Sequence, residues 1–165
     1  MGIYKVYIGL GTNLGDRKAN IEAAYTEIEA RIGKITKRSS FYKTPPWGFD
    51  STEHFVNTVA LVETQLYIGD LLTELKKIEQ EKGRKERKKT EGYSDRLIDL
   101  DIIDYNGISY RSERITVPHE RMLQRNFVVY PLAEINPNWI HPELKKAIKN
   151  LIADVPNQPP IENLS

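Results

Sequence analysis

The sequence predicts an α+β fold of the ferredoxin-like kind, with two helices on one face of a mainly antiparallel sheet and the other face left for loops and ligands. Segments of period-two alternation and segments with an apolar helical stripe follow one another in the order β-α-β-β-α-β, before a hairpin and C-terminal helices. The length of 165 residues fits one domain, and no internal repeat marks a boundary. We therefore expect a single domain over residues 1–155 and a poorly ordered tail over residues 156–165.

Composition excludes several classes of protein. The net charge of +1 gives no general attraction to nucleic acid or to anionic membranes. The chain has no cysteine, which excludes disulfides, thiolate metal sites and cysteine nucleophiles. No apolar run approaches the ~20 residues that span a bilayer, and the N-terminus does not resemble a signal peptide. We expect a cytoplasmic protein that binds neither nucleic acid nor membranes.

The first strand and helix are predicted from the N-terminal residues. Residues 3–10 alternate and indicate a strand, and a glycine-rich loop over residues 9–16 follows. Two of its glycines fit the dinucleotide-binding pattern G-x-G-x-x-G, but the third comes one residue late, so we interpret the loop as a tight turn into a helix. Asp16 is the expected N-cap of that helix, which runs to about Ile32.

Two further strands are expected, with a stiff loop between them. Residues 34–43 indicate a polar strand, and residues 44–49 then bring two prolines and two aromatic residues. Such a loop suits a lid over a flat ligand or a corner tucked into the core. Residues 54–66 form the next strand, with Phe55 and Asn57 on one face. Because asparagine is disfavoured inside strands, Asn57 either reads the edge of a stacked heterocycle or satisfies a neighbouring backbone group.

A second helix and a long polar loop come next. Asp70 is the expected N-cap, Glu79 falls on the margin of the apolar face, and Gly83 ends the helix. Residues 84–96 are rich in basic side chains and show no apolar periodicity. Loops of this length in a compact domain are usually functional or disordered, and a solvated charge run is the plain alternative.

The strand over residues 96–104 carries the most informative pattern. Its alternation places Ile98, Leu100 and Ile102 on one face and Asp99 with Asp101 on the other. Two residues advance a strand by roughly 6.6–6.8 Å, so the two carboxylates stand close enough to share hard cations. Mg²⁺ binds through one or two carboxylates and completes its shell with water and phosphate oxygens. A solvated strand face that happens to carry two acids is the alternative.

The remaining elements are shorter. Asn106-Gly107 predicts a type I′ hairpin turn, and residues 108–117 predict short strands. A helical region follows, with Arg121 and Arg125 four residues apart on one helix face. Residues 143–153 predict a last helix.

Several stretches together resemble the 6-hydroxymethyl-7,8-dihydropterin pyrophosphokinase family of folate biosynthesis. The combination of D-L-D-I with V-P-H is the most specific part of the likeness. The resemblance implies transfer of the pyrophosphoryl group of ATP to the hydroxymethyl group of a pterin alcohol, giving AMP and the pterin diphosphate, in a protein that we expect to be a monomer. The matching stretches, in the order of the family, are IGLGTNLGD (8–16), SSFYKTPPWG (39–48), FVNTVALVET (55–64), KIEQEKGR (77–84), RLIDLDI (96–102) and TVPHERMLQRNFVVYPL (116–132).

The resemblance also implies catalytic and ligand-binding residues. Asp99 and Asp101 match ligands of two Mg²⁺ ions, Arg84 and Arg96 match loop arginines that close on the triphosphate, and His119 matches a phosphate-contacting histidine. Phe55 and Phe127 would sandwich the pterin, whose edge Asn57 would read. The remaining substrate-binding positions are Thr44, Pro45, Trp47 and Arg125, and the nucleotide-binding positions are Lys76, Glu79, Arg84, Arg96, Ile102, Thr116 and His119.

One segment departs from the family pattern. The family often shows R-W-G-P-R before the aspartate strand, where this chain has residues 92–96, GYSDR. The final arginine is kept, Tyr93 can stand in for the tryptophan, and Arg87 or Lys88 can supply the missing charge.

Two other functions fit parts of the pattern. A ferredoxin-like sheet with aromatic residues can bind single-stranded RNA, and a nuclease or another phosphotransferase can use the same aspartate pair.

Overall fold

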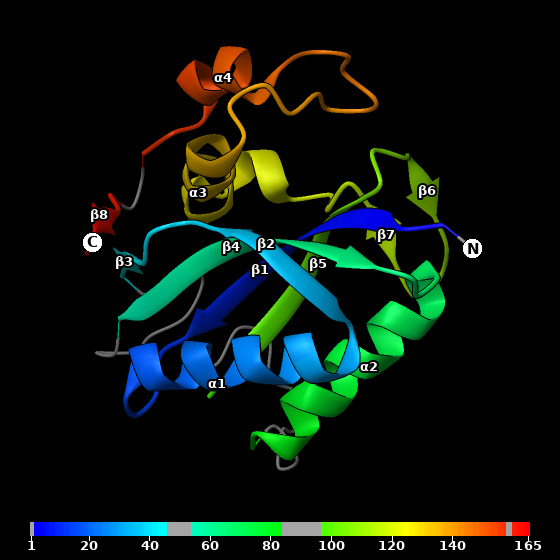
Figure 1. Cartoon of the computed structure of the whole chain (residues 1–165). Coiled ribbons are helices and arrows are strands. Elements are labelled where there is room, and N and C mark those ends of the chain that lie inside the picture. The colour runs from blue at the N-terminus through cyan, green and yellow to red at the C-terminus, as the bar shows by residue number, and fades with distance from the viewer. Residues whose placement is uncertain (1, 46–53, 84–96, 158–159) are drawn as a thin grey trace.

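The computed structural model describes residues 2–45, 54–83, 97–157 and 160–165. Its main sheet has six strands among these residues, in the order β5-β1-β4-β3-β8, and β2 also pairs with β4. All of these pairings are antiparallel. The order confirms the predicted ferredoxin-like arrangement, with β1 and β4 in the middle (Figure 1). The strands are β1 (Tyr4–Thr12), β2 (Gly33–Arg38), β3 (Tyr42–Thr44), β4 (Phe55–Thr64), β5 (Asp99–Tyr105) and β8 (Glu162–Asn163).

Helices α1 (Arg17–Arg31) and α2 (Ile68–Glu81) pack side by side on one face of this sheet (Figure 1). The core beneath them includes Leu10 from β1, Leu75 from α2 and Leu100 from β5, all nearly fully buried. Asp16 caps α1 as predicted, because its side chain accepts the Ala19 N–H at 3.1 Å.

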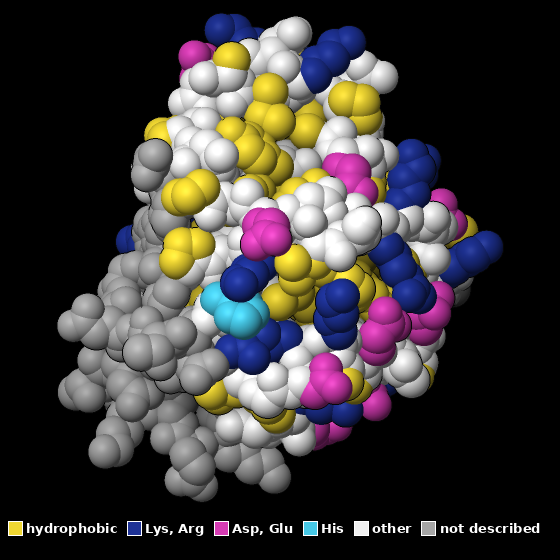
Figure 2. All heavy atoms as spheres, turned by 90° about the vertical axis from the view of Figure 1, so that its left-hand side faces the viewer, with side chains coloured by type: hydrophobic (Ala, Val, Ile, Leu, Met, Phe, Trp, Pro, Cys, Tyr) yellow, Lys and Arg dark blue, Asp and Glu magenta, His cyan; other side chains and the backbone are white. Residues whose placement is uncertain are grey.

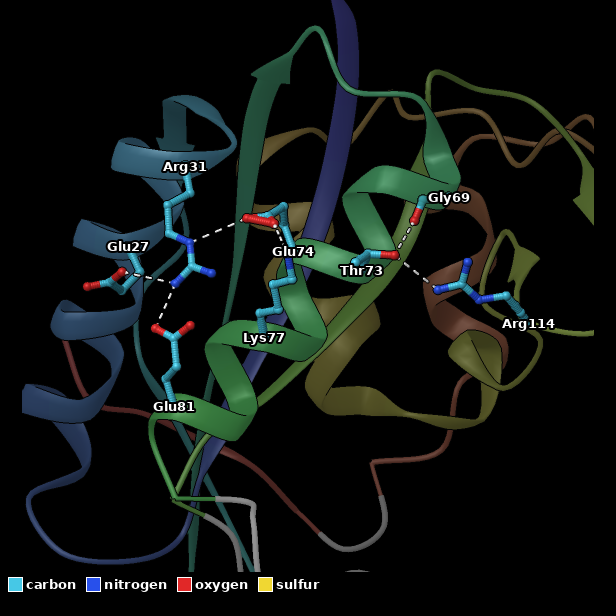
Figure 3. Close-up of polar contacts among 8 residues, drawn as sticks. All are labelled: Glu27, Arg31, Gly69, Thr73, Glu74, Lys77, Glu81 and Arg114. Atoms are coloured by element: carbon cyan, nitrogen blue, oxygen red, sulfur yellow. Dashed lines mark hydrogen bonds and ion pairs between the residues drawn. The ribbon is translucent and has the colours of Figure 1, made fainter.

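Arg31 joins the two helices at their surface (Figure 3). Its guanidinium lies 2.9 Å from Glu81, 3.4 Å from Glu27 and 3.5 Å from Glu74. The hydrogen bond to Glu81 is the main cause that raises the pKa of Arg31. Because these groups are partly exposed to solvent, the cluster orients the two helices and adds little to stability.

The opposite face of the sheet, which we expected to be left for loops and ligands, is partly covered by the C-terminal helices. α3 (Asn126–Ile135) lies against β4, with η2 (Met122–Gln124), α4 (Ile148–Leu151) and η3 (Ile152–Asp154) around it (Figure 1). This second core includes Tyr7, Val59 and Ile103 from the sheet and Val129 and Leu132 from α3. A hollow lined by residues of β1, β4, β5 and α3 remains at the edge of this covering.

Several predicted boundaries are wrong, because of strand pairing in one case and local backbone geometry in the others. The strand expected over residues 34–43 is two strands, β2 and β3, which pair with different parts of β4. α2 begins at Ile68 after Tyr67, without a side-chain cap, so Asp70 lies in its first turn, where the helix dipole favours an acid.

The region predicted as helical after His119 is confirmed from Asn126 onward, where α3 begins. Before α3, residues Met122–Gln124 form only a 3₁₀ turn, and Arg125 is extended at φ −119° and ψ 100°. Arg121 and Arg125 therefore do not share one α-helical face. The last helix is likewise shorter than the predicted 143–153, since α4 covers only Ile148–Leu151.

The predicted turn at Asn106-Gly107 is present. Both residues have positive φ, 52° and 70°, and the Ile108 N–H donates to the Tyr105 carbonyl at 3.1 Å, as a type I′ turn requires. The strand that follows does not return along β5. Instead, β6 (Tyr110–Arg111) pairs with β7 (Thr116–Val117) in a small separate sheet.

The C-terminal residues, for which we expected poor order, contain β8. It pairs with β3 at the edge of the main sheet, and the Leu164 N–H donates to the Phe41 carbonyl at 2.8 Å. This pairing is between backbone groups far apart in the chain, so the composition of the tail does not reveal it. On the face of the molecule that includes this edge, acidic and basic side chains are interspersed (Figure 2).

Candidate active site

Two glycines of the central strand open a hollow in the partly covered face of the sheet. β1 extends to Thr12, so Gly9 and Gly11 lie in the strand and not in the turn that we predicted from their spacing. Gly11 pairs with Asn57 of β4 on one side and with Asp99 of β5 on the other. Gly9 pairs in the same way with a residue of β4 and with Asp101 of β5. The acids and Asn57 therefore stand about 10 Å apart, twice the spacing of neighbouring strands, with bare backbone between them.

β5 divides its side chains as the alternation predicted. Leu100 and Ile102 are buried in the core beneath α1 and α2. Asp99 and Asp101 are partly exposed on the other face, and both line the hollow. The predicted pairing of the two carboxylates on one face is thus confirmed by the register of the sheet.

The first hollow, called the slot below, has two aromatic side chains in its lining. Phe55 enters from the start of β4 and Phe127 from the first turn of α3. The Asn57 amide donates to Thr44 Oγ1 at 3.2 Å and is almost fully buried. A flat apolar body with a polar edge fits such walls. The lining comprises Gly9, Leu10, Gly11, Thr44, Phe55, Asn57, Thr58, Asp99, Asp101, Ile103, Arg125, Phe127 and Val128.

A second hollow lies on the other side of the aspartates, against α2 and the small β6–β7 sheet. Four Lys or Arg side chains and His119 line it beside three acidic residues, so basic groups are in excess. One of them, Arg114, is held by a hydrogen bond from its Nη2 to Thr73 Oγ1 at 3.2 Å (Figure 3). A concave surface lined by several cations suits a polyphosphate. Its lining includes Leu72, Lys76, Asp101, Ile102, Arg114, Thr116, His119, Glu120, Arg121 and Arg125.

Asp101 and Arg125 line both hollows and mark the place where the two hollows meet, which we call the junction. Arg125 Nη1 lies 3.8 Å from Asp101 Oδ2, and the guanidinium lies 5.6 Å from the centre of the Phe127 ring. Arg125 is only 7% exposed, and burial lowers its pKa. A ligand in the slot and a ligand in the basic hollow would therefore contact each other beside this ion pair.

His119 is oriented by the backbone around it. The backbone N–H of His119 donates to the Ile103 carbonyl at 2.9 Å, and the ring Nδ1 accepts the backbone N–H of Arg121 at 3.2 Å. Because Nδ1 is an acceptor, the proton of the neutral ring is on Nε2, which can donate to a phosphate in the basic hollow. Burial is the main cause that lowers the pKa of His119, while Glu120 and Asp99 oppose that shift.

Glu79 lies beneath the site rather than in it. The residue is 1% exposed, and its carboxylate accepts the Leu100 N–H at 2.7 Å. The carboxylate also forms an ion pair with Lys76 Nζ at 3.3 Å. Lys76 itself is about half exposed and lines the basic hollow. Glu79 thus fixes the edge strand β5 against α2, and the contact with a nucleotide that the resemblance implies for it stays a prediction.

The aspartate pair suits a hard cation. In the described part of the chain, no three or more Asp, Glu or His side chains lie together in a way that could hold a metal ion by themselves. Two partly exposed carboxylates beside a basic hollow fit Mg²⁺, which takes few protein ligands and shares its shell with phosphate oxygens. Asp99 and Asp101 are the residues that would hold it.

Comparison with known proteins identifies the family. A family model described as 7,8-dihydro-6-hydroxymethylpterin-pyrophosphokinase (HPPK) matches residues 7–137. The chain belongs to the HPPK family. The 2-amino-4-hydroxy-6-hydroxymethyldihydropteridine pyrophosphokinase of Aquifex aeolicus is 42% identical over 144 residues, which cover 87% of this chain and 88% of that protein. The protein of the same name from Porphyromonas gingivalis is 40% identical over 139 residues, which cover 84% of this chain and 94% of that protein.

Solved structures support the fold of this HPPK chain. The crystal structure of Plasmodium falciparum HPPK-DHPS with pteroate superposes with a TM-score of 0.76 at 15% identity. The match covers 93% of this chain and 44% of that longer chain.

Most residues that the HPPK resemblance implies lie in or beside the two hollows. Pro45 follows Thr44 at the end of β3 and is exposed. Trp47, Arg84 and Arg96, with the substitutes Tyr93, Arg87 and Lys88, lie outside the described residues. Gly9, Gly11, Arg114 and Arg121 also line the two hollows, and no pattern in the sequence predicted a site role for them. Arg114 could have been suspected from its position two residues before Thr116, which the resemblance assigns to the nucleotide site.

Proposed function

We propose that this HPPK chain transfers the pyrophosphoryl group of ATP to the hydroxymethyl group of 6-hydroxymethyl-7,8-dihydropterin. The observation that carries the proposal is the meeting of an aromatic slot and a basic hollow at Asp101 and Arg125. A pterin fits the slot, and the triphosphate of ATP fits the hollow. The names of the curated relatives agree with this assignment of substrates.

In the proposed reaction, the hydroxymethyl oxygen attacks the β-phosphorus of ATP. The bond from the β-phosphorus to the oxygen bridging it to the α-phosphorus breaks, and AMP leaves with that oxygen. Asp99 lines the slot and can accept the hydroxyl proton. Little other covalent chemistry is required of the protein, so positioning and charge stabilisation dominate.

The residues of the junction would divide this work. Phe55 and Phe127 stack on the pterin while Asn57 reads its edge, which fixes the hydroxymethyl group toward the aspartates. Arg125 and the His119 Nε2–H face the phosphates and stabilise charge that develops as AMP leaves. We propose that Asp99 and Asp101 hold two Mg²⁺ ions, which when bound would neutralise the triphosphate.

Arg84 and Arg96, which lie outside the described residues, complete the proposed set of catalytic residues through the family resemblance. We further propose that the protein acts as a monomer in the cytoplasm and binds neither nucleic acid nor membranes. The net charge of +1 and the mixed surface charges in Figure 2 support this part of the proposal. In the described residues, no helix has the length and apolar character needed to cross a membrane.

Product analysis tests the proposal. The protein is incubated with ATP, Mg²⁺ and the pterin alcohol, and the products are separated by chromatography. We expect AMP and the pterin diphosphate in equal amounts, and no AMP when the pterin is omitted. Formation of ADP would indicate transfer of a single phosphoryl group, and AMP formed without the pterin would indicate hydrolysis. RNA binding with steep salt dependence and no AMP would favour the RNA-binding alternative.

A further inference from the structure

Gly11 lies in the pterin slot without any role in the proposed chemistry. It occupies the middle of a row of paired residues, between Asn57 of β4 and Asp99 of β5. A Cβ atom added to Gly11 would lie 2.6 Å from Asn57 Oδ1 and 3.8 Å from the Phe55 ring. The shorter distance is below van der Waals contact, so any side chain at position 11 would displace the Asn57 amide.

The Asn57 amide is held from its other side as well. Its Nδ2 donates to Thr44 Oγ1 at 3.2 Å, and Thr44 is 3% exposed. The amide is therefore clamped between a buried hydroxyl on β3 and the bare backbone of β1. With Nδ2 used by Thr44, the Asn57 oxygen lies over Gly11 at the floor of the slot, where it can accept a hydrogen bond from an N–H of the ligand.

The backbone of β1 does not explain the glycine. Gly11 is paired on both sides in regular antiparallel register, and its φ is outside the left-handed region that favours glycine. Glycine weakens the interior of a strand, and one common reason for its presence there is the close approach of another group. The close group here is the Asn57 side chain.

We infer that Gly11 is a positioning residue for the heterocycle, and that it acts by fixing the direction of the Asn57 amide oxygen. This inference rests on the proposed pterin slot. Because Gly11 and Asn57 do not line the basic hollow, their effect should be confined to the pterin and should spare ATP.

A double-mutant cycle with Gly11→Ala and Asn57→Ser tests the inference. We expect Gly11→Ala to raise KM for the pterin alcohol by about tenfold, the loss expected for one hydrogen bond. The affinity for ATP, measured by calorimetry, should stay within about twofold. In the Asn57→Ser background, where no amide is left to displace, Gly11→Ala should raise KM by less than about twofold.

Additive effects in the cycle would overturn the inference, because they would mean that the methyl group blocks the slot directly. An unchanged KM for the pterin in Gly11→Ala would overturn it as well. If Gly11→Ala lowers the yield of folded protein, Thr44→Val tests the same clamp from β3 without altering β1, and the same coupling with Asn57→Ser is expected. Wild-type protein that forms no AMP would refute the proposed function, whereas active wild type with an additive cycle would refute only the role of Gly11.

Discussion

Replacing Glu79 with alanine should lower the free energy of unfolding by about 2–4 kcal/mol. The Glu79 carboxylate is fully enclosed between α2 and β5 and accepts the Leu100 N–H at 2.7 Å. A hydrogen bond to a charged group contributes about 1.5–3 kcal/mol, and its loss would leave a buried N–H unpaired. The ion pair with half-exposed Lys76 adds at most about 1 kcal/mol. For a domain of this size, the sum corresponds to a fall in Tm of roughly 5–15 °C.

Thermal and urea unfolding of the purified variants measure this effect. Glu79→Gln keeps an acceptor for the Leu100 N–H and should lose only about half as much. Glu81→Ala is the matched control, since Glu81 is 57% exposed and its ion pair with Arg31 should contribute less than about 1 kcal/mol. Equal losses for Glu79→Ala and Glu81→Ala would refute the reasoning. A normal Tm with a raised KM for ATP would instead make Glu79 a nucleotide ligand, as the family resemblance implies.

Three further predictions concern the slot, the junction and the histidine. Phe127→Ala should weaken pterin binding by roughly 1–3 kcal/mol, the range for one lost aromatic stack, and leave ATP binding unchanged; equal loss of both ligands in calorimetry would contradict the slot. Asp101→Asn should reduce kcat at least about a hundredfold and lower stability by about 1 kcal/mol, because buried Arg125 loses an ion-pair partner, while Asp104→Asn at the far end of β5 should keep most activity. Because the pKa of His119 is lowered, the folded protein binds fewer protons than the unfolded chain near this pKa. The contribution of neutral His119 to stability is therefore present above the unfolded pKa of about 6.5 and is lost as the pH falls toward the folded pKa. ATP phosphates beside His119 should raise its pKa, so the wild type should take up more protons on ATP binding near pH 6 than His119→Gln does. Calorimetry in buffers of different ionisation enthalpy measures this uptake, and identical uptake would contradict a contact between His119 and the phosphates.

The sequence was most informative where side-chain period and local caps decide the structure. The alternation around Asp99 and Asp101 predicted their shared face, and Asp16 predicted the start of α1, since both depend on neighbours in the chain. The slot residues Phe55 and Asn57 followed from the same period of two. Their meeting with Phe127 came only from the family resemblance, because no local pattern brings β4 and α3 together.

The predictions that failed depend on contacts between residues far apart in the chain. Gly9 and Gly11 resemble turn residues by propensity, but pairing on both sides places them in the central strand. Glu79 lies at the margin of an amphipathic helix, yet it is buried because its carboxylate accepts the Leu100 N–H, which β5, as an edge strand, does not pair with another strand. Pairing of β8 with β3 and covering of the second face by α3 are long-range contacts, which single-sequence patterns do not contain.

The most direct test of transfer at the junction is a crystal structure of the protein with the pterin alcohol and a non-hydrolysable ATP analogue. We predict the pterin ring between Phe55 and Phe127, with the β-phosphorus beside Asp101 and Arg125. The hydroxymethyl oxygen should lie about 3–3.5 Å from that phosphorus, as a near-attack geometry requires. A pterin bound outside the slot, or a β-phosphorus too far from the hydroxymethyl oxygen for in-line attack, would contradict the account.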